Sequence, residues 1–243
     1  MKKKYSPLAM ALLGVLVVFN HIQVIAQKKV TGSGNVTVVD YEVDSFSSLE
    51  LDGVFHVYIR QGEQEKVEVE TDDNLHQYVI VENRGKKLVI DTQNKVNFRK
   101  KKRMNIFVTI RDIERLEIAG VGNVESEGRL ELNDLELRIK SVGKVNLELV
   151  ADYLEADINS VGNVTLAGRI KKADIENGGV GRLAAYDLEN KVLDLRASGV
   201  GKTEVYASQE IAIKSTGVGS VFYKGDAVVT KLNVRGVGKV KKR

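Results

Sequence analysis

The clearest pattern along the chain is a short motif that recurs seven times between residues 120 and 240. Each copy has a small residue, a valine, a glycine and a polar residue, usually followed by a second valine. The central valines are Val121, Val142, Val161, Val180, Val200, Val218 and Val237. Their spacings, by subtraction, are 21, 19, 19, 20, 18 and 19 residues. A fixed period of this kind indicates a repeat architecture, in which each unit buries its apolar face by stacking on its neighbours.

Within each copy, odd positions counted from the central valine are apolar or small, and even positions are largely polar. Five residues before it stand Leu116, Leu137, Ala156, Ile175, Leu195, Ile213 and Leu232. Strand side chains alternate between two faces, so the pattern predicts half-buried strands. At about 3.3 Å per residue, one repeat traces a loop of roughly 60 Å. We therefore predict an all-β fold, a single-stranded parallel β-helix (β-solenoid) of 18–21-residue coils, right-handed by the preference of parallel crossovers.

The N-terminal third carries an altered copy of the same unit. Residues 49–59 align with the copy centred on Val121, but Phe55 replaces the second glycine. Since an open solenoid end exposes core and strand edges, we expect Phe55 to close the end of the core. Further strands are predicted at 66–70, 77–82, 87–91 and 105–111, with a hairpin turn at 83–85. One domain over 27–243 follows, with an irregular, β-rich N-terminal cap at 37–115 and regular repeats at 116–243.

The orientation of the central valines is open to two interpretations. On strict alternation they point outward and form an apolar stripe, which would favour contact with a second copy of the chain or another partner. Glycines on both sides give the backbone freedom to rotate, which would instead turn each valine into the core. We expect the second arrangement.

The first 26 residues have the layout of a secretory signal. Lys2, Lys3 and Lys4 precede an apolar run at 8–19, and small or apolar residues precede Gln27. The run is shorter than the roughly 20 residues that span a bilayer, although an uncleaved anchor is the alternative. Cleavage would leave 243 minus 26, or 217 residues, and lower the net charge from +4 to about +1. We expect an exported protein, in the periplasm or at the cell surface, with no transmembrane span in the mature chain and no nucleic-acid partner.

Motifs for catalysis or cofactor binding are weak. The segment 199–203 ends in Gly-Lys-Thr, but Arg196 stands where a phosphate-binding loop needs glycine, and strand rather than helix follows. There is no cysteine, and the mature chain keeps only His56 and His76, which we interpret as surface histidines. The repeat aspartates share no single offset. We expect no catalytic residues, cofactor or metal, with a carbohydrate-active β-helix enzyme (polysaccharide lyase or hydrolase) as the alternative.

Two sets of polar residues are candidates for partner contact. The first is the column two residues after each central valine, here called the contact column: Asn123, Lys144, Asn163, Arg182, Lys202, Ser220 and Lys239. The second is the basic run Arg99, Lys100, Lys101, Lys102 and Arg103, since clustered positive charge attracts polyanions. A solvated ladder and a solvated loop are the plainer interpretations of the two.

The chain resembles the family of putative auto-transporter adhesins with a head GIN domain. The resemblance rests on residues 46–51, 53–62, 67–70 and 116–122 with its successors, and covers about residues 37 to 243. It implies an exported β-helical protein placed among adhesins. Together with the repeat, it favours a non-enzymatic binding or structural module that engages a surface glycan or a protein partner through a repetitive rod face.

Overall fold

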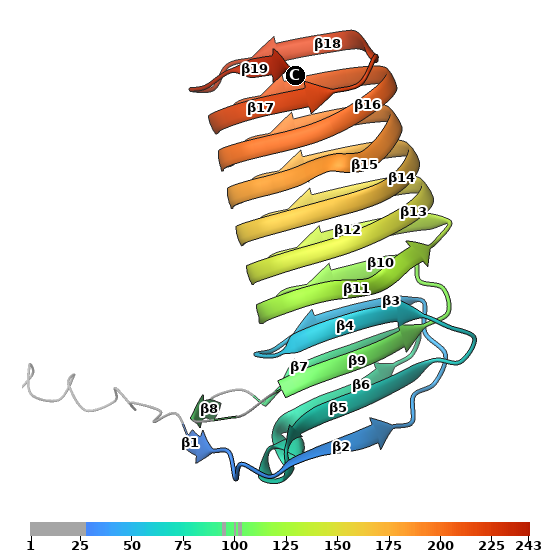
Figure 1. The fold of residues 1–243 in the computed structure, drawn as a ribbon, viewed down its shortest axis with the longest axis vertical. Coiled ribbons are helices and arrows are strands. Elements are labelled where there is room, and N and C mark those ends of the chain that lie inside the picture. Colours follow the sequence, from blue (N-terminus) through green and yellow to red (C-terminus); the bar gives the residue numbers. More distant parts are fainter. Residues whose placement is uncertain (1–27, 94–95, 100, 102–103) are drawn as a thin grey trace, which may run out of the picture.

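The computed structural model describes residues 28–93, 96–99, 101 and 104–243, so the signal segment expected at 1–26 lies outside the described residues. The chain forms an upright stack of flattened coils (Figure 1), which confirms the predicted β-solenoid of stacked parallel coils of about 19 residues. The strands of the N-terminal third are β1 (Lys28–Thr31), β2 (Val36–Tyr41), β3 (Ser48–Asp52), β4 (His56–Gln61), β5 (Lys66–Asp72), β6 (Val79–Arg84), β7 (Lys87–Thr92), β8 (Val96–Arg99) and β9 (Met104–Ile110), with a 3-10 helix η1 (Asp73–Tyr78).

The regular coils are made of longer strands. These are β10 (Arg115–Ile118), β11 (Val121–Glu131), β12 (Asp134–Ile139), β13 (Val142–Ile158), β14 (Val161–Asn177), β15 (Val180–Ala197), β16 (Val200–Ser215), β17 (Val218–Lys224), β18 (Val228–Val234) and β19 (Val240–Lys242). Each coil turns at the Gly/Ser-Val-Gly segment, here called the corner. The residues that lead into the corners form one wall of the stack, the pre-corner wall, and the residues that follow the corners form the post-corner wall. Each of β13 to β16 starts in the post-corner wall and ends in the pre-corner wall.

The corners lie directly above one another. Val121 is the parallel partner of Val142, and the same pairing continues from coil to coil up to Val237. The stacking brings neighbouring backbones very close. A Cβ built on Gly181, whose φ is +136°, would lie 2.0 Å from the carbonyl oxygen of Gly162. The repeated glycine is therefore a steric requirement of the stack, because no side chain fits between two corners.

The expectation that the corner valines turn into the core is wrong. All of them point outward. The alternation of side chains continues through the corner, so the residues on either side of each valine, and not the valine itself, face the backbone of the neighbouring coil. Together with Val54 they form one line, here called the valine ridge, in which the side chains are 42% to 73% exposed: Val54, Val121, Val142, Val161, Val180, Val200, Val218 and Val237.

The core consists of aliphatic rows inside the two walls. Leu116, Leu137, Ala156, Ile175 and Leu195 are buried at equivalent positions of successive coils. The row changes in the last coil, where the equivalent Leu232 is 57% exposed.

The altered copy at 49–59 is a true coil of the stack, but it is out of chain order. β3 pairs with β10 on one side and with β7 on the other, and β4 likewise lies between β11 and β9. The coil made of β7 and β9 thus lies below β3 and β4, although it follows them in sequence (Figure 1). The chain must step past one coil between β9 and β10.

Phe55 does not close the core, contrary to the sequence-based expectation. Its ring is buried, but the stack continues beneath it through β7 and β9. Below these strands the pattern becomes antiparallel, with β6 against β7 and β5 between β9 and β2. Leu75 and Tyr78 of η1 are buried against this end. The predicted hairpin turn is confirmed between β6 and β7, where Gly85 has a φ of +63°.

Candidate functional site

The contact column exists as a physical row on the outside of the post-corner wall. Asn123 pairs with Lys144, and the register continues through Asn163, Arg182 and Lys202 to Ser220. Lys239 precedes Val240, which pairs with Val221 in the last coil. Parallel strands lie about 4.8 Å apart, so the column presents one polar side chain per coil at that spacing.

The upper part of the column is committed to internal ion pairs. Glu204 is almost fully buried, with a side chain 4% exposed, and it accepts hydrogen bonds from Arg182 and Lys202. Burial alone would raise the pKa of Glu204, but the hydrogen bonds from Lys202 and Arg182 outweigh it and hold that pKa below its usual range. Arg182 and Lys202 therefore stabilise the fold through Glu204 as well as contributing positive charge to the surface.

Phe222, at the same end of the rod, is in contact with three cations, one of which is Lys202. The ammonium of Lys202 lies 5.2 Å from the centroid of the Phe222 ring, that of Lys239 lies 5.8 Å away, and the guanidinium of Arg243 lies 4.6 Å away. Cations over an aromatic face are attracted by the quadrupole of the ring. The lower members Asn123, Lys144 and Asn163 form no ion pair or side-chain hydrogen bond with the described residues. The free part of the contact column is thus its lower half.

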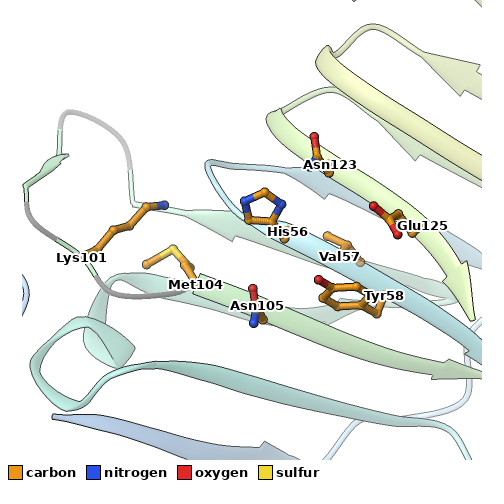
Figure 2. Close-up of a pocket in the computed structure, with 8 residues that line it drawn as sticks. All are labelled: His56, Val57, Tyr58, Lys101, Met104, Asn105, Asn123 and Glu125. Carbon is orange, nitrogen blue, oxygen red and sulfur yellow. The ribbon is translucent and has the colours of Figure 1, made fainter. Parts of the chain in front are cut away.

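The column continues downward into the N-terminal third and ends in a pocket. The register places His56 beside Asn105, and the next coil places Asn123 beside His56. Here the wall is hollowed into a pocket of about 530 Å³. Figure 2 shows the side chains that line it. Its lining residues are His56, Val57, Tyr58, Lys101, Met104, Asn105, Asn123 and Glu125.

Two of the pocket residues are held in place by hydrogen bonds. Asn105 donates from Nδ2 to Glu70 Oε2 at 2.7 Å, which fixes the amide and leaves its oxygen as an acceptor. Lys101 Nζ donates to the carbonyl oxygen of Val54 at 2.8 Å, and burial lowers the pKa of this lysine. The hydroxyl group of Tyr58 and the carboxylate of Glu125 have no hydrogen-bond partner among the described residues.

The basic run is only partly described, since Lys100, Lys102 and Arg103 lie outside the described residues. Arg99 ends β8 and is exposed. Lys101 is half-buried and turned back toward the corner at Val54, with its ammonium 5.8 Å from the Phe98 ring centroid. Arg99 and Lys101, which were predicted to contact a partner together, therefore differ. Arg99 is exposed, whereas Lys101 is half-buried and hydrogen-bonded to the backbone.

The pre-corner wall carries acidic grooves. One of about 410 Å³ is lined by Asp112, Glu114, Asn133, Asp134, Leu135, Glu136, Tyr153 and Glu155, and an adjoining one of about 260 Å³ by Glu136, Arg138, Tyr153, Glu155, Ala156, Asp157, Asp174, Glu176 and Arg196. The aspartates of the repeat share no offset, but glutamates of neighbouring coils complete the cluster. Sequence reasoning missed this grouping because it considered aspartate alone.

Several groups in these grooves are already paired. Glu136 forms ion pairs with both Arg115 and Arg138, each with an N–O distance of 2.5 Å. The hydroxyl of Tyr153 donates to Asp174 Oδ2 at 2.7 Å, and this hydrogen bond, with burial, raises the pKa of Tyr153 to about 12. Tyr153 therefore stays protonated at neutral pH.

The two histidines of the described residues lie in different parts of the molecule and form different contacts. His76 Nε2 lies 3.0 Å from Thr37 Oγ1 at the lower end of the molecule, whereas His56 is exposed at the pocket. Within the described residues no three His, Cys, Asp or Glu side chains are arranged to hold a metal ion.

The family model of the "Putative auto-transporter adhesin, head GIN domain" matches residues 45–227, and the chain belongs to this family. Its fold is similar to that of a putative adhesin from Bacteroides fragilis, at 27% identity and a TM-score of 0.85, over 88% of this chain and 100% of that one. A putative lipid binding protein from Parabacteroides distasonis has the same fold, at 19% identity and a TM-score of 0.66, over 89% and 100% of the two chains. No curated protein matches the chain.

The family assignment places the chain among adhesin-like proteins, which agrees with a binding role and with an exported or surface protein. Among the helices of the described residues, none has the length and apolar character needed to cross a bilayer.

Sequence analysis found part of the pocket and missed the rest. Asn123 belongs to the predicted column, and His56 was expected on the surface. Tyr58, Asn105 and Glu125 were not identified. Tyr58 and Glu125 both stand four residues after a corner valine, so an outward row at that offset is the signal that would have found them. Asn105 could not be found this way because its coil lacks the motif.

Proposed function

We propose that the protein is an exported, non-enzymatic, adhesin-like module that binds a surface glycan or a protein partner through its post-corner wall. The observation that carries this proposal is the unbroken register of the contact column, in which equivalent polar side chains recur once per coil. A rigid row of this kind can make the same contact several times with a polymer that lies along the rod, and repeated weak contacts add up to avidity.

The first test is binding of the mature protein to an array of neutral and acidic glycans. The variant Lys144→Ala/Asn163→Ala removes two of the column side chains that lack partners among the described residues, and binding should fall by about tenfold or more. The matched control is Lys214→Ala/Asn233→Ala, which makes the same chemical change on the pre-corner wall. Equal binding by both variants would exclude the column.

The proposed export is tested by the N-terminus of the protein recovered from cells. Mass spectrometry should find a mature chain that begins at Gln27, in the periplasmic or surface fraction. A chain that begins before Gln27 would refute the proposed cleavage and would favour the uncleaved anchor.

The basic run remains a second proposed contact, for acidic glycans or lipopolysaccharide. Its support is the position of Arg99, which is exposed at the end of β8. Replacement of residues 99–103 by Ser should lower binding to heparin and leave binding to neutral glycans unchanged. A uniform loss on both would count against a specific anionic contact.

The acidic grooves favour a second candidate function, a carbohydrate-active enzyme, because convergent carboxylates are the groups that glycoside hydrolysis needs. The ion pairs of Glu136 and the protonated Tyr153 argue against a ready-made acid and base there. Incubation with polysaccharides and assay for new reducing ends or unsaturated products tests this candidate. Activity that disappears in Glu155→Gln would establish it.

The valine ridge supports self-association. Its eight side chains form an apolar line about 34 Å long at the strand spacing of about 4.8 Å. A second copy carries a ridge of the same period, so two ridges laid side by side can bury their valines against each other. Sedimentation should show an oligomer that Val161→Asp/Val180→Asp converts to a monomer, whereas Glu189→Asp should leave it intact.

A further inference from the structure

At the lower end of the contact column, the polar row of the post-corner wall becomes a concave site. It lies over β4, β9 and the start of β11, with Lys101 at its edge (Figure 2). Its volume of about 530 Å³ is within the range of small-molecule sites. The voids at the corners are far smaller, about 20 and 10 Å³, and hold no ligand of this size.

The polar groups of the pocket include both donors and acceptors. The Asn123 amide supplies both kinds, Glu125 supplies acceptors, and the Tyr58 hydroxyl can do either. None of these three side chains has a hydrogen-bond partner among the described residues. Sugar hydroxyls each donate and accept, so a mixed set of unpaired groups suits a polyhydroxylated ligand better than one that only accepts.

An aromatic pair adjoins these groups. Tyr58 stacks on Phe107 of the next strand, with ring centroids 5.1 Å apart and planes inclined by 16°. Both rings are half-buried on the outer side of the wall. They give a rigid apolar surface beside the hydrogen-bonding groups, which is the combination that recognises the mixed C–H and O–H surface of a sugar.

The charges of the described residues that line the pocket nearly cancel. Among them, Lys101 is the one cation and Glu125 is the one carboxylate. Lys101 is also turned toward the backbone of Val54, which occupies one of its donors. A phosphate or uronate would need more positive charge, and a cation would need more carboxylates, so the balance favours an uncharged ligand.

The groups are held in place by the stack itself. His56 and Asn105 are register partners, and Asn123 lies in the coil directly above. Asn105 is anchored further by its hydrogen bond to Glu70. A site on paired strands loses little conformational entropy when a ligand binds, because its backbone is already fixed.

We propose that this pocket binds a neutral sugar residue, as the end point of a glycan that lies along the lower half of the contact column. The proposal rests on the proposed glycan-binding function and specifies its ligand class and its main site.

The experiment uses the fact that the mature chain holds only two histidines. Proton NMR of the mature protein follows the ring signals of His56 and His76 during titration with mannotetraose, cellotetraose and laminaritetraose, and in a parallel series with tetragalacturonate. Assignment comes from His56→Ala. At least one neutral tetrasaccharide should shift the His56 signals and leave those of His76, which lies against Thr37, unchanged.

The variant Asn123→Ala should weaken binding of that tetrasaccharide by about tenfold, and Asn159→Ala at the corner serves as the matched control with parental affinity. Thermal unfolding confirms that both variants are folded. Binding to the array that is lost in Lys144→Ala/Asn163→Ala, without movement of His56 or an effect of Asn123→Ala, would overturn the pocket and leave the proposed function standing.

Two further outcomes also decide the matter. A response of His56 to tetragalacturonate alone would overturn the neutral ligand class. Absence of binding to every glycan of the array and to all four tetrasaccharides would overturn both this proposal and the glycan-binding function on which it rests.

Discussion

The regular coils and the N-terminal third share one corner geometry but differ in the order and pairing of their strands. From β10 upward each coil repeats the coil below. Near the top, the outward cations Arg182 and Lys202 form ion pairs with Glu204, and Lys202 also lies over the ring of Phe222. In the N-terminal third the coils are out of chain order, antiparallel pairs follow below the parallel coil of β7 and β9, and polar groups at a pocket lack partners among the described residues. Repetition thus gives equivalent surface positions in successive coils, whereas its interruption gives the pocket around His56.

The largest expected effect separates the two regions by their glycines. Gly181 and Gly85 both have positive φ, but a Cβ on Gly181 would meet a carbonyl oxygen at 2.0 Å, whereas one on Gly85 would meet nothing within 4 Å. Gly181→Ala should lower the free energy of unfolding by about 3 kcal/mol or more, and Gly85→Ala by about 1 kcal/mol. Urea denaturation measures both. Equal losses would mean that φ strain alone, and not the close stacking of corners, requires the glycine.

The second effect compares two glutamates that stand four residues after a corner valine. Glu204 is buried between two cations, whereas Glu125 faces the pocket without a described partner. Glu204→Gln should cost about 1.5–3 kcal/mol, because charged hydrogen bonds are lost in a buried site. Glu125→Gln should change stability by less than about 0.5 kcal/mol, as at other surface positions.

The pH dependence of the same pair follows from the pKa of Glu204. Since folding lowers that pKa, the stabilisation is fully present above the unfolded value and is lost as pH falls through the folded value. The stability difference between the parent and Glu204→Gln should therefore shrink in acid. A difference that stays constant down to pH 3 would contradict the assigned ion pairs.

The smallest effect compares two tyrosines. Tyr153 donates to Asp174, whereas the Tyr58 hydroxyl has no partner among the described residues. Tyr153→Phe should cost about 1 kcal/mol and Tyr58→Phe close to nothing. Because the pKa of Tyr153 is raised to about 12, its contribution is present below the ordinary tyrosine range and disappears as pH rises toward 12. Thermal unfolding between pH 7 and 11 checks the size and the trend.

Much of the fold was predictable because apolar and polar residues alternate within each repeat. The inward row from Leu116 to Ile213, the alignment of residues 49–59 and a hairpin between β6 and β7 are confirmed. Leu232 is exposed instead, and the turn lies at Gly85 and Lys86 rather than at 83–85. These features depend on which face a side chain takes, and a period of two fixes that face wherever one side is buried.

The candidate site was only half predictable. Asn123 follows from the repeat, but its neighbours Asn105 and Tyr58 come from strands whose place in the stack the motif does not encode. The same limit explains the error at Phe55, which has a further coil below it.

The sequence by itself determined that the chain coils, how long each coil is and which residues line its interior, since these are consequences of periodic burial. Only the tertiary structure decided that the corner valines face solvent, that β7 and β9 lie beneath β3 and β4, and that unpaired polar groups converge around His56. Those features depend on contacts between segments far apart in the chain, where the free energy of packing and backbone approach, not local propensity, selects the arrangement.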